Sequence, residues 1–543
     1  MWQASRLVND LTRVVPLMAD SPDDSELGPS PRRVPLLTRI RSHKTLGRIE
    51  TEFEVESVLF ISVVKWFVLA SAAGAMVGIG ATLFMNAVVW AETLRGFHRL
   101  SHVLLPVGFV VSAAIVKYLA PGAEGHGTEK IIEGIHRRGG QFSLRVMPAR
   151  LVATFVTLAV GGSVGRQGPA AQFGTALCSA LARVLRLEGR DRRKLVICGI
   201  SAGFAAVFGT PVAGAIFGIE VLFCGRVLYE VLFPAFVAGM TAYHVSSALG
   251  IAYFHHPIEF VPEFSELFFI TIAVAGLFFG LCSLAAIECL AIARKASETR
   301  RVGWVGKALI GGSILAVLAA VTSTRYLGTG YATINETFEA GDIPWYAFLL
   351  KIAFASITLN FGGSGGILTP LFFVGATAGR SFATLVHAHP ATFAAIGMVA
   401  LLAGATNTPI ASTIMAVELF GSDVAAYAAG ACAISFLITG HRSVFPAQVL
   451  SFRKSSSISA EVGRELEDVH THVHPRDHTV LSTALRMTES VGRAYHRLDD
   501  RMHARTPRPS DKVASGVETT SAARERDDPD EIPSDDPPAG SEQ

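Results

Sequence analysis

Apolar stretches alternate with short charged connections over residues 55–450, and this pattern predicts helices that cross a membrane. A helix needs about 20 apolar residues to cross about 30 Å of hydrocarbon. Several segments reach or approach that length, namely 60–90, 103–119, 227–252, 267–293, 308–321 and 425–438. We therefore predict an all-α polytopic membrane protein with short loops.

Shorter apolar runs lie between these segments, at 149–160, 172–185, 195–208, 212–223, 348–359, 371–385, 393–402 and 410–420. They are too short to be simple spans, and glycine-rich breaks join them. Irregular backbone facing lipid leaves polar groups without partners, so such breaks belong inside protein, against a polar cavity. Tilted and re-entrant helices are the favoured interpretation. The alternative is a simple bundle with glycine and proline kinks.

The two halves of the apolar region carry matching breaks about 200 residues apart. The stretch SVGRQGP at 163–169 corresponds to SGGILTP at 364–370. A second pair opens on Thr-Pro, with TPVA at 210–213 and TPIA at 408–411. Paired breaks in two hydrophobic halves indicate inverted-topology repeats with a binding site near the middle of the membrane.

Each glycine-rich break supplies the parts of an anion site. A helix N-terminus carries about half a positive charge and unpaired N–H groups, which suit an anion. Glycines let the backbone approach an ion, and Pro169 and Pro370 suit the first turn of a helix. If the halves are inverted, the two helix starts meet from opposite sides and can hold a dehydrated anion.

Charged residues in the loops predict the orientation. Basic residues concentrate in 130–145, 183–194 and 294–307, whereas 254–266 and 322–346 hold several acids and the single basic residue Arg325. Because cytoplasmic loops carry the excess of Lys and Arg, we place the first group in the cytoplasm. Both termini are then expected to be cytoplasmic.

Composition separates the membrane region from two polar tails. Half of the 543 residues are hydrophobic and only 17% are charged, against about 25% in soluble proteins. We predict a cytoplasmic, largely disordered tail at 1–54, a first membrane repeat at 55–252, a second at 253–450, and another largely disordered cytoplasmic tail at 451–543.

Other functional classes find little support. A net charge of +2 gives no reason to expect a nucleic-acid partner, and the six cysteines have no metal-ligand spacing. Four histidines in the C-terminal tail fit a solvated linker better than a metal site: His470, His472, His474 and His478. We expect no metal, no cofactor and no enzymatic activity, because no catalytic motif occurs in a suitable context.

The motifs together resemble those of one family. They are G-R-x-G-P at 165–169, G-G-I-x-x-P at 365–370, the stretch from Ala202-Gly203 through Pro211 to Glu220, and the Gly125-His126-Gly127 turn before a helix at about Thr128. Over roughly 60–450 the chain resembles the CLC chloride channel and transporter family, of the prokaryotic type without C-terminal regulatory domains. The resemblance implies a homodimer with one anion pathway in each subunit. It also implies an anion site formed by His126, Gly165, Arg166, Gln167, Gly168, Ile367, Leu368 and Phe445.

Two departures from the family pattern concern protons. The gate position is normally glutamate, which combines an anion gate and a proton carrier, and here it is Gln167. An amide has no proton to exchange near neutral pH and no charge to compete with chloride. The family's inner proton-relay glutamate follows the position of Glu220, where this chain has Val221. Proton-coupled exchange by the familiar route is therefore not expected, and a substitute path through His126 is an alternative.

Two further departures concern the central site. His126 replaces a serine and Phe445 replaces a tyrosine whose hydroxyls contact the ion in many relatives. Phe445 can act only as a wall. An imidazole N–H at His126 can replace a lost donor, with a charge that changes between about pH 5 and 8. A pH-sensitive site is one hypothesis, and a neutral histidine packed at a helix start is the other.

Three charged residues have two interpretations each. Arg166 is either a cation that sets the field near the outer mouth, which we favour, or a partner of a surface acid. Glu220 and Glu418 occupy equivalent repeat positions. An ionisable residue inside such helices is a functional candidate, but hydrogen bonding to neighbouring backbone is the favoured interpretation.

The sequence thus predicts passive, uncoupled movement of chloride across the cell membrane, with Gln167 leaving the outer site open. An anion/proton antiporter with a non-standard proton path is the nearest alternative. A non-conducting membrane sensor or scaffold is another. The retained Pro169 argues against a fluoride-selective protein.

Overall fold

The computed structural model describes residues 41–97, 101–120, 127–258, 260, 262, 265–299, 302–339, 341–455 and 458–473. His126 and most of both predicted tails lie outside the described residues. The first half contains α2 (Arg41–Phe97), α3 (Leu105–Leu119), α4 (Gly127–Arg138), α5 (Val146–Ala159), α6 (Gln167–Val184), α7 (Gly189–Phe208), α8 (Pro211–Glu220) and α9 (Tyr229–Ala248). The second contains α10 (Glu266–Thr299), α11 (Trp304–Val321), α12 (Tyr331–Phe338), α13 (Ala347–Asn360), α14 (Leu368–Leu385), α15 (Pro390–Thr406), α16 (Pro409–Phe420) and α17 (Ala425–Ile438).

Five helices are long and apolar enough to cross a membrane: Glu54–Arg95, His102–Leu119, Tyr229–Ala248, Glu266–Glu298 and Trp304–Val321. The sequence placed a long apolar segment at each of these. The sixth predicted segment, 425–438, is the shorter apolar helix α17. Large hydrophobic side chains such as Leu83, Leu267 and Val321 are at least 70% exposed, as expected for faces that contact lipid.

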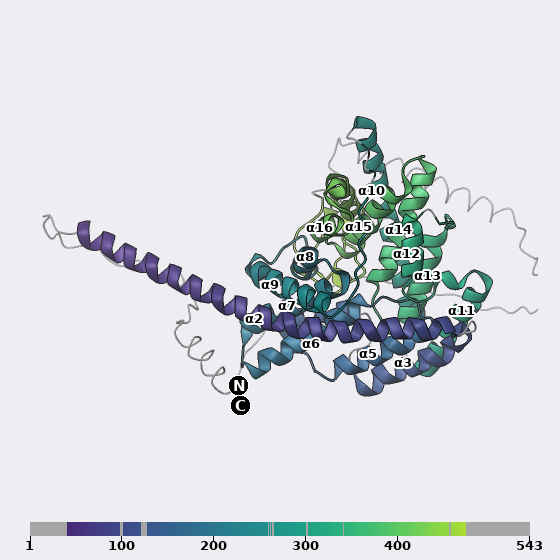
Figure 1. The fold of residues 1–543 in the computed structure, drawn as a ribbon, viewed down its shortest axis with the longest axis horizontal. Coiled ribbons are helices and arrows are strands. Elements are labelled where there is room, and N and C mark those ends of the chain that lie inside the picture. The colour runs from purple at the N-terminus through teal and green to yellow at the C-terminus, as the bar shows by residue number, and fades with distance from the viewer. Residues whose placement is uncertain are drawn as a thin grey trace, which may run out of the picture. The chain divides into compact units, whose positions relative to one another are not determined.

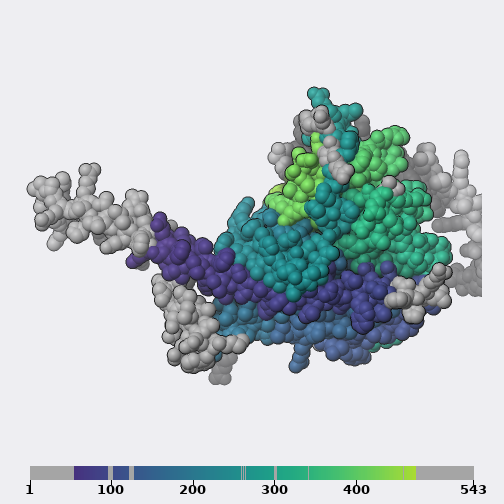
Figure 2. All heavy atoms as spheres, in the orientation of Figure 1, coloured from purple at the N-terminus to yellow at the C-terminus, as the bar shows by residue number. Residues whose placement is uncertain are grey.

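The first half packs α2, α3, α5 and α6 side by side (Figure 1). In Figure 2 the purple atoms of α2 lie against teal atoms of the same half, and part of the purple segment projects beyond them. This helix begins at Arg41, so residues 41–54, which the sequence placed in the tail, are helical. Leu59 and Phe60 on the projecting part are exposed.

The re-entrant helices come in closely packed pairs, α6 with α7 and α14 with α15. A Cβ on Gly174 would lie 2.3 Å from the carbonyl oxygen of Gly199, and a Cβ on Gly375 would lie 2.5 Å from that of Gly397. Only glycine lets the helix backbones of each pair approach so closely. The same contact in both halves supports the repeat that the sequence predicted.

The buried Glu220 and the half-buried Glu418 tie the halves together reciprocally. The Glu220 carboxylate at the end of α8 accepts hydrogen bonds from the N–H groups of Ile410 (3.1 Å) and Ala411 (2.8 Å) at the start of α16. The Glu418 carboxylate on α16 accepts from Val212 (2.9 Å) and Ala213 (2.8 Å) at the start of α8. Each carboxylate fills the donor-rich start of the other half's helix. The favoured structural interpretation of both glutamates is confirmed.

The structure describes four two-residue strands, one after α8 and three after α17. β1 (Phe223–Cys224) pairs in parallel with β2 (Val449–Leu450), and β3 (Ile458–Ser459) pairs antiparallel with β4 (His472–Val473). Cys224, Phe436, Leu450, Ala460 and Leu466 form a small buried cluster here. The described first part of the predicted C-terminal tail, 451–455 and 458–473, therefore packs against the end of α17 and the segment after α8.

Replacing Glu418 with alanine is expected to destabilise the contact between the halves. Two backbone N–H groups would lose their acceptor inside the protein, which costs about 1–3 kcal/mol per group. The midpoint of thermal unfolding of the detergent-purified protein should fall. Asp423→Ala, which removes an exposed carboxylate nearby, is the control. Equal midpoints for the two variants would contradict the capping role.

Candidate functional site

The two glycine-rich breaks meet directly through their backbones. The N–H of Gly165 donates to the carbonyl oxygen of Gly366 (2.7 Å), and the N–H of Gly366 donates to that of Gly165 (2.8 Å). A Cβ on Gly366 would lie 2.6 Å from the nitrogen of Gly168. A larger residue at 366 would therefore separate the two breaks.

Matching hydrogen bonds hold the two breaks in position. The N–H of Ser163 donates to the Thr358 hydroxyl (3.1 Å), and the N–H of Ser364 donates to the Thr157 hydroxyl (3.0 Å). Each bond runs from one half to the other. The chain turns before each serine at a glycine with positive φ, Gly161 at 99° and Gly362 at 104°, a conformation that favours glycine.

A third helix start adjoins the pair. The starts of α6 and α14 follow Gly165 and Gly366 within two residues. The start of α4 lies beside α6, since a Cβ on Gly127 would be 3.0 Å from the carbonyl carbon and oxygen of Gly168. The helix that the sequence placed at about Thr128 thus begins at Gly127. Three helix N-termini converge at one buried place, with their partial positive charges.

The donors available for an anion are those of the first helical turns. N–H groups in a first turn have no acceptor within the helix, and this applies to Gln167, Gly168, Ile367 and Leu368. The N–H of Gly165 already donates to Gly366, so the predicted donor role does not fit Gly165. Its function is the close approach of the two breaks. Anion contact at the other four positions stays a prediction.

Gln167 is fully buried, and its amide joins the two halves. The side-chain oxygen accepts a hydrogen bond from the Thr369 hydroxyl. The side-chain nitrogen donates to the Tyr331 hydroxyl (3.2 Å). Both partners belong to the second half, while Gln167 begins α6 of the first. The amide therefore occupies the space beside the converging helix starts.

Arg166 lies over an aromatic ring. Its guanidinium carbon is 4.4 Å from the centroid of the Tyr331 ring, a cation–π distance. Its buried Nε has no hydrogen-bond partner, and Arg166 forms no ion pair among the residues that the structure describes. The geometry gives no support to the surface-pairing alternative.

A buried lysine supports the segment that carries Tyr331. Lys351 on α13 is fully buried, and its Nζ donates to the carbonyl oxygens of Tyr326 (3.0 Å) and Gly328 (2.9 Å). Glu92 on α2 accepts from the N–H and hydroxyl of Thr329. These contacts fix the chain just before α12, whose first residue is Tyr331.

Sequence reasoning missed Tyr331, Thr369 and Lys351. Lys351 left a signal, because it is a lone cation in the apolar run 348–359. Tyr331 left none, since it lies 164 positions from Gln167 in a short polar segment.

The predicted anion contacts of two further residues, His126 and Phe445, also stay predictions. His126 lies outside the described residues. Phe445 is fully buried in the main hydrophobic cluster, and its N–H donates to the Ser443 hydroxyl (3.0 Å). Its predicted role as a wall of the site stays a prediction.

No group of three or more His, Cys, Asp or Glu side chains is arranged to hold a metal among the described residues. Of the four tail histidines, His474 and His478 lie outside them. Near the predicted cytoplasmic side, burial raises the pKa of Glu129 on α4, and the neighbouring Arg294 and Lys130 oppose that rise.

These features define a polytopic all-α membrane protein, with two inverted halves whose helix N-termini meet inside the protein. The profile described as voltage gated chloride channel matches residues 107–440. The chain belongs to this family, as its motifs indicated.

Relatives and solved structures agree on the fold. The chain is 38% identical over 409 residues to a chloride/fluoride channel protein of Pseudomonas syringae pv. tomato, covering 72% of this chain and 88% of the relative. It is similar to the crystal structure of a CLC-type fluoride/proton antiporter, with TM-score 0.69 and 27% identity over 72% of this chain and 98% of the other. A slow cyanobacterial Cl⁻/H⁺ antiporter shares the fold, with TM-score 0.61 and 20% identity over 69% and 94% of the two chains.

Tyr331→Phe is expected to raise anion flux through reconstituted protein. The variant removes the acceptor for the Gln167 amide but keeps the ring under Arg166. A hydrogen bond contributes about 1 kcal/mol, so its loss changes the equilibrium between the bound and released positions of the Gln167 side chain about fivefold. Flux from vesicles should increase by about that factor.

Tyr229→Phe is the control for this change, because Tyr229 is 76% exposed on α9. Equal flux through both variants and the unaltered protein would mean that the Tyr331 hydroxyl does not restrain the path.

Proposed function

We propose that this protein moves chloride and other small anions passively across the membrane, without coupling to protons. The observation that carries the proposal is the buried, uncharged Gln167 at the start of α6, bound on both sides of its amide by Thr369 and Tyr331. A carboxylate at this position can carry a proton into the site and compete with an anion. An amide does neither near neutral pH.

The surroundings support an anion rather than a cation as the transported ion. The starts of α6 and α14 offer N–H groups with partial positive charge, without a full cation that would hold an anion too tightly. Among the described residues, neither the N-cap side chain nor a distant acid caps these two starts by a hydrogen bond. The second proton station of the family pattern is also replaced, since Val221 is a buried apolar residue.

Anion/proton exchange is the second candidate function, and the similar proteins favour it. Two of the similar solved structures are antiporters, one of fluoride and protons and one of chloride and protons. An exchanger without the usual glutamate needs another proton carrier, and His126 is the residue that the sequence offers.

Fluoride enters the proposal as a candidate anion. The retained Pro169 argued against fluoride, but the similarity to a chloride/fluoride channel protein and to a fluoride/proton antiporter counts against that argument. We further propose a homodimer in the cell membrane with both termini in the cytoplasm.

Flux measurements on purified protein in liposomes test the proposal. Under a chloride gradient, the protein should release chloride at a rate that an opposed pH gradient leaves unchanged. Chloride-driven uphill proton movement in a fixed ratio would overturn uncoupled transport and establish exchange. Parallel measurements with bromide, nitrate and fluoride rank the anions.

Gln167→Glu is expected to make anion flux depend on pH. A carboxylate beside the helix starts competes with the anion when it is ionised and yields when it is protonated. Flux should therefore fall as the pH rises through the pKa of the introduced group and recover as the pH falls.

Gln141→Glu, at an exposed position, introduces the same charge away from the site and serves as the control. Identical pH profiles for both variants and the unaltered protein would show that position 167 lies outside the pathway.

A further inference from the structure

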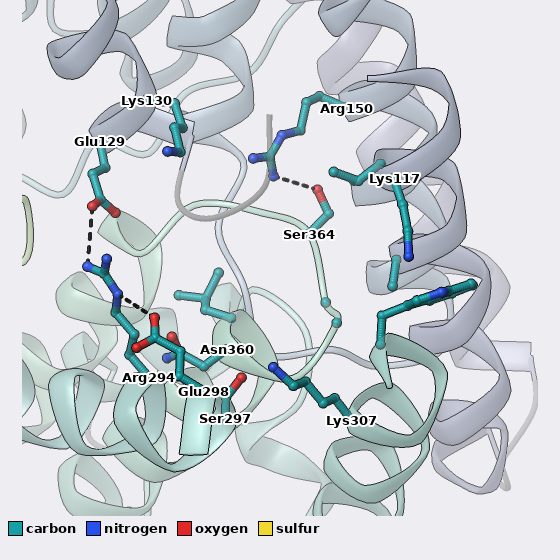
Figure 3. Close-up of a pocket in the computed structure, with 16 residues that line it drawn as sticks. Lys117, Glu129, Lys130, Arg150, Arg294, Ser297, Glu298, Lys307, Asn360 and Ser364 are labelled. Atoms are coloured by element: carbon teal, nitrogen blue, oxygen red, sulfur yellow. Dashed lines mark hydrogen bonds and ion pairs between the residues drawn. The ribbon is translucent and has the colours of Figure 1, made fainter. Parts of the chain in front are cut away.

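A charged cavity lies between α3, α4, α5, α10 and α11, beside the segment that precedes the second glycine-rich break. Its volume is about 370 Å³. Five basic residues line it, namely Lys117, Lys130, Arg150, Arg294 and Lys307, against two acids, Glu129 and Glu298. Figure 3 shows these side chains arriving from different helices around one hollow. The loop 294–307 places this cavity on the predicted cytoplasmic side.

Internal ion pairs neutralise part of this charge. Arg294 lies 3.6 Å from a Glu129 oxygen and 3.2 Å from a Glu298 oxygen. Lys130 lies 2.8 Å from Glu133. Arg150 is buried and donates to the Ser364 hydroxyl (3.1 Å).

Two lysines of the cavity keep their charge uncompensated. Within the described part of the chain, neither Lys117 nor Lys307 forms an ion pair. Lys117 is nevertheless held in place, because its Nζ lies 5.0 Å from the centroid of the Trp304 ring. Tyr118 packs edge-on against the same ring, with centroids 5.9 Å apart. The cavity therefore presents fixed positive charge.

Exposed apolar residues neighbour the lining residues Lys117, Trp304 and Lys307 in the chain and form the apolar rim of our proposal. Tyr118 and Leu119 at the end of α3 are 70% and 60% exposed, and Val305 and Leu309 on α11 are also exposed. Both helices are long and apolar enough to cross the membrane. Tryptophan and lysine at the ends of such helices mark the level of the lipid headgroups. A ligand here meets cations and hydrocarbon-facing surface together.

We propose that this cavity binds the phosphate headgroup of an anionic phospholipid, with Lys117 and Lys307 as its principal charge partners. Basic pockets between membrane helices on the cytoplasmic side suit such headgroups. The exposed apolar rim favours a lipid over a soluble phosphate, because only a lipid brings acyl chains to cover it.

The headgroup site adjoins the second glycine-rich break. Gly362, Gly363 and Ser364 line the cavity, and the next residues are Gly365 and Gly366. A bound lipid therefore contacts the segment that leads into the anion site, and membrane composition can act on that segment from the cytoplasmic face.

Native mass spectrometry of the full chain in detergent tests this proposal. The protein is titrated with phosphatidylglycerol and with phosphatidylcholine of the same acyl chains. Phosphatidylglycerol should bind more tightly. The double variant Lys117→Ala/Lys307→Ala should bind it about thirty-fold more weakly, because each lysine contributes about 1 kcal/mol near a charged headgroup. Its phosphatidylcholine binding should not change.

Arg190→Ala/Arg193→Ala is the matched control. It removes two exposed charges from α7, on the same predicted side of the membrane, and should leave phosphatidylglycerol binding unchanged. Equal weakening in both double variants would overturn the proposal in favour of general surface charge. An unaltered thermal midpoint and chloride flux in phosphatidylcholine vesicles check the fold, and they separate this result from a failure of the proposed transport function.

A titration with inorganic phosphate distinguishes a site for a lipid headgroup from a site for free phosphate. For a lipid site, free phosphate should displace phosphatidylglycerol only weakly and should bind poorly alone. If phosphate binds at Lys117 and Lys307 while phosphatidylglycerol shows no preference over phosphatidylcholine, the lipid assignment is wrong.

Discussion

The two hydrogen bonds between Gly165 and Gly366 fix how closely the two halves approach, and the anion site depends on that distance. Irregular backbone inside a membrane protein must satisfy its polar groups within the protein. Here each break satisfies the other, and the threonine hydroxyls of Thr157 and Thr358 satisfy the serine N–H groups behind them. The helices that follow are thereby aimed at one point. In the proposed function, an anion at this point meets the partial positive charges of several helix starts.

The contacts of Gln167 explain how a polar amide can be buried beside the starts of α6 and α14. Its oxygen needs a donor and finds the Thr369 hydroxyl, and its nitrogen needs an acceptor and finds Tyr331. Tyr331 in turn depends on a loop that Lys351 and Glu92 hold from two different helices. Lys351 thus supports the site indirectly, through the backbone carbonyls that it contacts. Arg166 covers the ring of Tyr331.

The sequence predicted the parts of this arrangement that recur locally. Matching breaks at 163–169 and 364–370 were visible as glycine and proline patterns, and the helix expected at about Thr128 begins one residue earlier. The equivalent positions of Glu220 and Glu418 also indicated their backbone bonding. What the sequence could not predict depends on contacts between distant segments.

The contact between Tyr331 and Gln167 joins two segments that are far apart in the sequence. Tyr331 meets Gln167 only because two folded halves place them together, and no local pattern records that. The same holds for Gly165, which the sequence included in the anion site and whose N–H donates to Gly366. The packing of 451–473 onto Cys224 and Phe436 was missed for the same reason, since its strands are only two residues long.

A comparison of four helix starts supports the position that we propose for the anion. The starts of α8 and α16 receive the carboxylates of Glu418 and Glu220, which satisfy their N–H groups and neutralise their partial charge. Within the part of the chain that the structure describes, the starts of α6 and α14 receive no such side chain. Two of these four helix starts therefore have an acid of the opposite half as acceptor for their N–H groups, and the other two do not. Because an unfilled donor set inside a membrane protein is costly, the open pair favours a mobile anion in the role that glutamate takes elsewhere.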